Sequence, residues 1–80
     1  MDDLAILNRI SALVGEEHAI LDREGSGAPE PGDHNRLREV QVTLDQCWDL
    51  LRQRRAYRET GNDPDQARPR DATTVEHYQQ

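Results

Sequence analysis

The first row of apolar residues lies between Asp3 and Glu24, and it has the three-and-four spacing of one face of an α-helix. Its members are Ile6, Leu7, Ile10, Leu13, Val14, Ile20 and Leu21. This row covers a wide arc of a helical wheel, and the width indicates two packing neighbours instead of one. Asp2 and Asp3 suit the N-terminal cap and the positive end of the helix dipole, and Gly25 suits the stop.

A second apolar row predicts a second helix over 34–59. Its face comprises Leu37, Val40, Leu44, Cys47, Trp48 and Leu51. Asp33 is expected to be the N-cap of this helix, and Gly61 is expected to stop it.

The segment GSGAPEPGD, over 25–33, is rich in Gly and Pro and predicts a linker without regular structure. A connection this short favours an antiparallel hairpin of helices at about 3–24 and 34–59, although a flexible linker also permits exchange of helices between two chains. The register of the hairpin pairs three positions of each helix: Ile20 with Leu37, Leu13 with Leu44, and Ile6 with Leu51.

The predicted fold class is therefore all-α, with a helical hairpin over 1–61 and a C-terminal tail over 62–80. A lone hairpin leaves one flank of each helix open, and one Cys cannot form an intramolecular disulfide to stabilise so small a chain. Packing two hairpins into a four-helix bundle covers the open flanks. A homodimer is therefore the preferred architecture.

Two pairs of residues stand out in the tail. Asp63 followed by Pro64 predicts a short helical turn. Val75 and Tyr78 are spaced three apart and could make one docking contact. The sequence leaves open whether the tail is largely disordered or docks on a helix.

The chain has 16 acidic residues against ten arginines and no lysine, which gives a net charge of −6. This balance argues against a general nucleic-acid binder, because such a protein needs a positive face. No apolar run approaches the roughly 20 residues of a membrane-spanning helix, so no membrane partner is expected. Acids follow Met1 where a secretory signal carries bases, and a cytoplasmic protein is therefore expected.

Glu17 lies near the middle of the first apolar row, where a charged carboxylate needs a partner. One interpretation is a bundle metal site or a general base that involves Glu17 and the neighbouring His18. Adjacent residues lie about 100° apart on a helix, however, and a dimetal bundle site has its Glu and His three positions apart. We therefore expect a buried polar contact between Glu17 and Gln41, or an arginine of a second chain, with no metal or other cofactor.

Cys47 could be a nucleophile or a redox thiol, because arginines follow it and would lower its pKa. Its position on the apolar row instead predicts a small buried residue. Nothing in the sequence matches a catalytic signature, and no enzyme is predicted.

Four arginines close the second helix: Arg52, Arg54, Arg55 and Arg58. They could form a phosphate-binding patch with Tyr57 for stacking, or they could pair with Asp2 and Asp3, which the hairpin brings to the same end. Arg55 is predicted to project toward the apolar face and Arg52 away from it, which argues against one basic surface.

Leu50 and Tyr57 are seven positions apart, on a flank away from the apolar row. They could contact the tail, a second hairpin or an unknown protein partner, and the sequence does not decide between these.

The runs LVGEEHAIL, LDQCWDLLRQRR, GNDPDQAR and TVEHY resemble a family of short actinobacterial proteins classified as domain of unknown function 2630. The linker GSGAPEPG is richer in Gly and Pro than the family pattern, which affects the loop only. The resemblance implies an actinobacterial cytoplasmic protein, brings no activity with it, and implies that the tail belongs to the fold.

The function that the sequence favours is a non-enzymatic helical interaction or scaffold protein that acts as a homodimer. The alternative is a nucleic-acid-associated regulator that uses the arginines. The expected contact surface comprises Leu50, Arg52, Arg54, Arg55, Tyr57 and Arg58.

Overall fold

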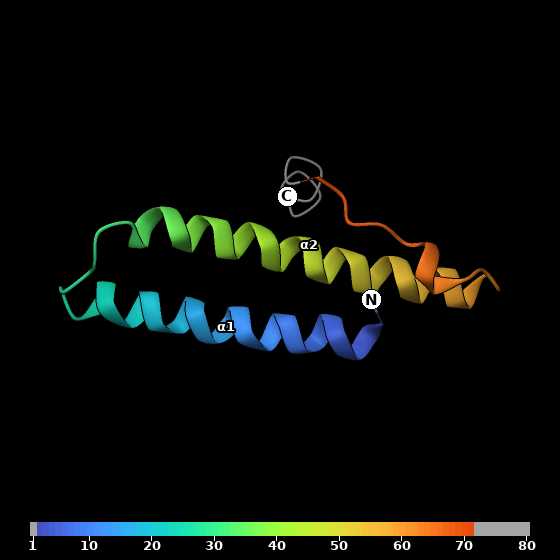
Figure 1. Cartoon of the computed structure of the whole chain (residues 1–80), viewed down its shortest axis with the longest axis horizontal. Helices are drawn as coiled ribbons and strands as arrows, with labels where there is room; N and C mark the ends of the chain where they lie inside the picture. The colour runs from blue at the N-terminus through green and yellow to red at the C-terminus, as the bar shows by residue number, and fades with distance from the viewer. Residues whose placement is uncertain (1, 72–80) are drawn as a thin grey trace.

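The computed structural model describes residues 2–71, which form two long helices and one short helical turn. Helix α1 (Asp3–Gly25) and helix α2 (Asp33–Glu59) lie side by side in opposite directions, and the 3-10 helix η1 (Pro64–Gln66) follows (Figure 1). The prediction of an all-α antiparallel hairpin is confirmed. Neither α1 nor α2 is sufficiently long and apolar to cross a membrane, in the part of the chain that the structure describes.

Helix α1 begins and ends with local hydrogen bonds that replace those missing inside the helix. The Asp2 carboxylate caps the start by accepting a hydrogen bond of 2.8 Å from the Ala5 backbone N–H. At the other end, Gly25 was predicted to be the stop, but it is the last helical residue. Gly27 instead adopts the left-handed conformation (φ +77°) and donates its N–H to the Glu24 carbonyl.

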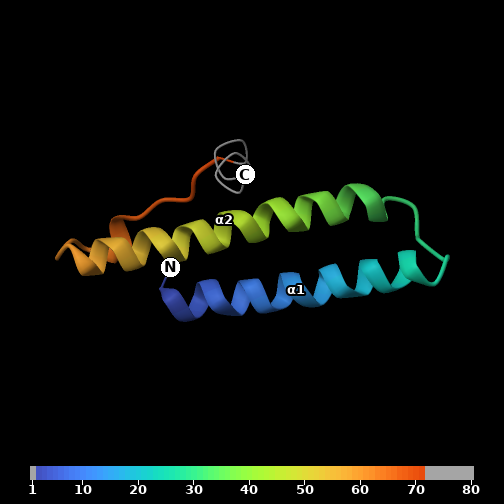
Figure 2. The same cartoon turned by 180° about the vertical axis from the view of Figure 1, so that it is seen from behind.

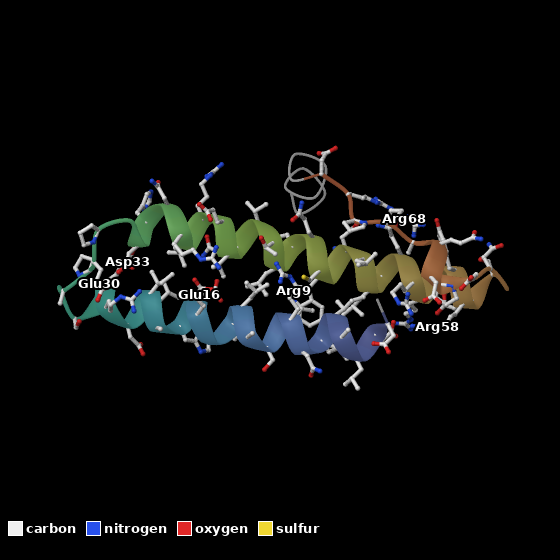
Figure 3. All side chains as sticks on the ribbon, viewed as in Figure 1. Arg9, Glu16, Glu30, Asp33, Arg58 and Arg68 are labelled. Atoms are coloured by element: carbon white, nitrogen blue, oxygen red, sulfur yellow. The ribbon has the colours of Figure 1, made fainter. Side chains whose placement is uncertain are left out.

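The start of α2 differs from the prediction. The N-cap is Gly32, and Asp33 is already the first helical residue. The Asp33 carboxylate does not bond to the first turn of α2, because it accepts hydrogen bonds of 2.9 and 2.8 Å from Arg23 and one of 2.8 Å from the Glu30 backbone N–H. Asp33 therefore joins the end of α1 to the linker (Figure 3).

Helix α2 ends as the sequence predicts. Gly61 has a φ of +79° and donates to the Arg58 carbonyl, while Asn62 donates to the Tyr57 carbonyl. These two bonds form a Schellman motif, which requires a left-handed residue and therefore favours glycine. The chain can then reverse its direction.

The tail runs back along α2 on the side away from α1, as the two opposite views agree (Figures 1 and 2). The Asp63 side chain caps η1 by accepting from the Asp65 N–H, as expected for the Asp-Pro pair. Two glutamines of α2 then hold the tail backbone: Gln53 donates to the Arg68 carbonyl (2.7 Å) and Gln46 to the Arg70 carbonyl (3.1 Å). Residues 62–71 are therefore docked. Val75 and Tyr78 lie outside the described residues.

The core cluster contains residues from both helices and from the tail: Ile6, Ile10, Leu13, Val40, Leu44, Cys47, Leu50 and Ala67. Two predictions for α2 are wrong. Trp48 was placed in the core but is 43% exposed, and Leu50 was placed outside it but is only 9% exposed. The reason is that α2 packs against α1 and also against the tail, which turns its buried face toward Leu50.

Candidate functional site

The arginine end of α2 is a network of ion pairs that joins three parts of the chain. Arg54 is buried and donates to Asp3 at the start of α1 (2.5 Å), to the Asp65 carboxylate (2.9 Å) and to the Pro64 carbonyl (3.1 Å). Arg58 lies within 2.8 Å of the same Asp3 carboxylate. Hydrogen bonds from Arg54 and Arg58 hold the pKa of Asp3 below its ordinary value.

The expected pairing with the acidic start of the chain is thus formed through Asp3, while Asp2 serves as the helix cap. The prediction that Arg55 projects toward the apolar face is wrong. Arg54 takes that place, and Arg55 is exposed and pairs with Glu59 at 3.0 Å. The tail again explains the difference, because it supplies Asp65 and the Pro64 carbonyl on that side of α2.

The residues expected to form one contact surface are therefore divided by the structure. Arg52, Arg55 and Arg58 are exposed, Tyr57 packs half-buried against the core, and Leu50 and Arg54 are buried. Figure 3 shows Arg58 at the end of the hairpin opposite the linker. In this conformation, a partner could reach only part of the expected surface.

The predicted contact between Glu17 and Gln41 is present, with 3.4 Å between Gln41 Nε2 and Glu17 Oε2. It is not buried, because Gln41 is exposed at the edge of the helix pair. The neighbouring Glu16 binds Arg36, whose hydrogen bonds lower the pKa of that carboxyl. Within residues 2–71, no group of His, Cys, Asp and Glu side chains is arranged to hold a metal ion.

Cys47 is buried, as predicted, at 8% exposure. Burial raises the pKa of its thiol, and the nearby Arg9 opposes this effect only in part. The arginine that approaches the thiol therefore comes from α1, and not from the cluster that follows Cys47 in the sequence. A thiol with a raised pKa is a poor nucleophile at neutral pH.

A small cavity of about 210 Å³ adjoins Cys47, between α1, α2 and the tail. Its lining residues are Arg9, Thr43, Gln46, Cys47, Leu50 and Pro69. Sequence reasoning missed Arg9. The available signal was that Arg9 and Arg23 are the only arginines of the first helix, and that Arg9 directly precedes the buried Ile10.

A second surface is apolar and lies on the other side of the hairpin. Leu7, Leu21 and Trp48 are 45%, 43% and 43% exposed, and we call this surface the open flank. Residues two apart on a helix point in nearly opposite directions. Trp48 therefore points away from Leu50, which packs in the core cluster with Ala67 of the tail. Leu7 likewise points away from Arg9, which lines the cavity.

The comparisons with known proteins agree with the resemblance seen in the sequence. A family model described as "Protein of unknown function (DUF2630)" matches residues 2–80. Uncharacterized proteins of Mycobacterium tuberculosis and Mycobacterium bovis are each 47% identical to this chain over 77 residues, which covers 95% of this chain and 88% of theirs. No solved structure matches the chain. The chain therefore belongs to the DUF2630 family of proteins of unknown function.

Proposed function

We propose that this protein is a non-enzymatic interaction module, and that two hairpins pack along their open flanks to form a homodimeric four-helix bundle. The observation that carries the proposal is the open flank itself. Leu7 and Leu21 lie on α1 and Trp48 lies on α2, and all three expose large apolar surface. Contiguous exposed apolar surface marks interaction sites on small proteins.

The charges of the two helices favour a second copy of the chain as the partner that packs on the open flank. Helix α1 carries more acids than bases: Asp3, Glu16, Glu17, Asp22 and Glu24 against Arg9 and Arg23. Helix α2 carries one more base than acid: Arg36, Arg38, Arg52, Arg54, Arg55 and Arg58 against Asp33, Glu39, Asp45, Asp49 and Glu59. Four of these arginines, Arg36, Arg54, Arg55 and Arg58, also pair with acids of their own chain. When α1 of one copy lies beside α2 of the other, the acidic excess of α1 faces the small basic excess of α2 twice, across a two-fold axis, and two α1 helices are kept apart.

The apolar contacts supply the affinity in this arrangement. Full burial of an exposed large apolar side chain gains about 1.5–3 kcal/mol. Leu7, Leu21 and Trp48 are 43–45% exposed, so each gains the remaining part of this amount, and the two-fold axis buries each of them twice. Charges at the rim contribute little affinity but fix which helices meet.

The experiment is sedimentation equilibrium of the full chain at micromolar concentrations. We expect a species of twice the 9.2 kDa chain mass, and Leu7→Glu and Trp48→Glu should convert it to a folded monomer. Ala12→Glu is the matched control, because it adds the same charge to an exposed position on another face of α1. A helical wild-type monomer at about 100 µM, far above the Kd of a stable dimer, would refute the proposal.

The ion pairs argue against the nucleic-acid alternative. Arg54 pairs with Asp3 and Asp65, Arg58 pairs with Asp3, and Arg55 pairs with Glu59. A phosphate group would have to compete with these carboxylates for the arginines.

A further inference from the structure

The cavity beside Cys47 is open on one side and is lined by three segments that are distant in the sequence. Arg9 comes from α1, Cys47 and Leu50 come from α2, and Pro69 comes from the tail. The docked tail contributes Pro69 to its wall. The cavity lies on the opposite side of the hairpin from the open flank, so it is separate from the proposed dimer interface.

The residues that line the cavity indicate which hydrocarbon group a ligand can place in it. Cys47 and Leu50 are buried, and Pro69 adds a further apolar surface. A volume of about 210 Å³ is smaller than the roughly 300–1,000 Å³ of sites for drug-sized ligands. The cavity therefore suits a short aliphatic chain or a single ring.

The guanidinium of Arg9 indicates which charged group a ligand in this cavity carries. Arg9 is an exposed residue of α1 that lines the cavity, and Figure 3 shows it between the two helices near the middle of the hairpin. The structure gives acidic partners to Arg23, Arg36, Arg54, Arg55, Arg58 and Arg70, but none to Arg9 among the described residues. A guanidinium binds a carboxylate through two parallel hydrogen bonds. In a chain of net charge −6, a single arginine suits a monoanion better than a doubly charged phosphate.

We propose that this cavity binds a small apolar monocarboxylate, with the hydrocarbon part against Cys47, Leu50 and Pro69 and the carboxylate on Arg9. The ligand contacts α1, α2 and the tail together. Its binding therefore also stabilises the docked tail.

The test is a titration of the full-length protein with hexanoate, followed by amide chemical shifts in NMR spectra. We expect saturable shifts around Cys47, Leu50 and residue 70, with 1-hexanol binding about tenfold more weakly because it lacks the charge. Arg9→Gln should reduce hexanoate affinity to that of 1-hexanol. Arg55→Gln, which removes an exposed arginine elsewhere on α2, should leave hexanoate affinity unchanged.

A second measurement uses the thiol in the cavity wall. Saturating hexanoate should slow the alkylation of Cys47 by iodoacetamide at least about threefold, because the ligand covers the sulfur. The absence of saturable shifts up to tens of millimolar, equal binding of hexanoate and 1-hexanol, or unchanged binding by Arg9→Gln would each overturn the proposal. These outcomes are independent of the sedimentation result, since neither Arg9 nor Cys47 lies on the open flank.

Discussion

Arg54 Nε donates a hydrogen bond of 2.5 Å to Asp3 Oδ1, which lies 51 positions earlier in the chain. The same guanidinium binds Asp65 and the Pro64 carbonyl. One buried side chain thus fastens the start of α1, the end of α2 and the docked tail to one another. The ends of a small hairpin otherwise separate easily, because few contacts hold them.

This relationship predicts a large effect of Arg54→Met. The variant keeps the apolar stem of the side chain but removes the donor to the Pro64 carbonyl and to the Asp65 carboxylate, and it leaves Asp3 paired with Arg58 alone. We expect its melting temperature to fall at least about twice as far as that of Arg55→Met, which breaks one exposed pair on the same helix. Circular dichroism melts of both variants provide the comparison. Equal losses would mean that the Arg54 network contributes nothing beyond a surface ion pair.

The pKa values predict that acid destabilises the fold. Hydrogen bonds from Arg23 and then from the Glu30 N–H lower the pKa of Asp33 from 3.8 to about 2. The folded protein therefore binds fewer protons than the unfolded chain in this range, and the stability from Asp33 is complete above pH 3.8 and is lost as the pH falls toward 2. Asp3 acts in the same direction.

Urea unfolding between pH 2 and pH 6 measures this effect. Asp33→Asn should flatten the decline of stability below pH 4, while Asp22→Asn, on the exposed side of α1, should leave it unchanged. An Asp33→Asn curve with the wild-type slope would show that Asp33 does not carry the acid sensitivity.

Because Leu50 is buried, we expect its truncation to destabilise the fold as much as truncation of a core residue does, although the helical pattern alone places Leu50 outside the core. Leu50→Ala should lower the free energy of unfolding by about 2–4 kcal/mol, because it leaves a cavity between α2 and the tail. Leu4→Ala makes the same change at a position that is 65% exposed, and it should cost less than about 1 kcal/mol. Chemical denaturation of the two variants separates the core position from the surface position.

The tail itself can be tested at Ala67, which is 7% exposed and packs in the core cluster. Ala67→Glu should displace the tail, because a carboxylate cannot be buried there without a partner. Trypsin should then cleave after Arg70 much faster than in the wild type, while Gln66→Glu, an exposed position next to it, should not change the rate. Mass spectrometry of a limited digest identifies the cleavage site.

Much of the hairpin could be predicted from local signals. Apolar spacing located both helices, Asp2 and Gly61 marked ends that the structure confirms, and Asp63 marked the turn of η1. These signals depend on neighbours a few residues away. They can therefore be read from the sequence alone.

The errors on the buried face of α2 share one physical cause, which is a third packing partner that the periodicity of α2 cannot reveal. The tail covers one side of α2, so Leu50 is buried where Trp48 was expected, and Arg54 is buried where Arg55 was expected. A helical wheel shows which residues share a face, but it does not show how many faces are covered. The cavity was missed for a similar reason, because its lining joins Arg9 of α1 and Pro69 of the tail to the side chains of α2.

The way in which the tail is held also bears on how this family can vary. Gln46 and Gln53 bind backbone carbonyls of the tail, and every amino acid has a carbonyl. Substitutions at residue 68 therefore preserve the bond to Gln53, whereas Arg70 also pairs with the buried Asp49 and residue 67 must stay small to fit the core. Relatives can thus change the charge and chemistry of the outer tail surface over evolution while they retain the same docked path.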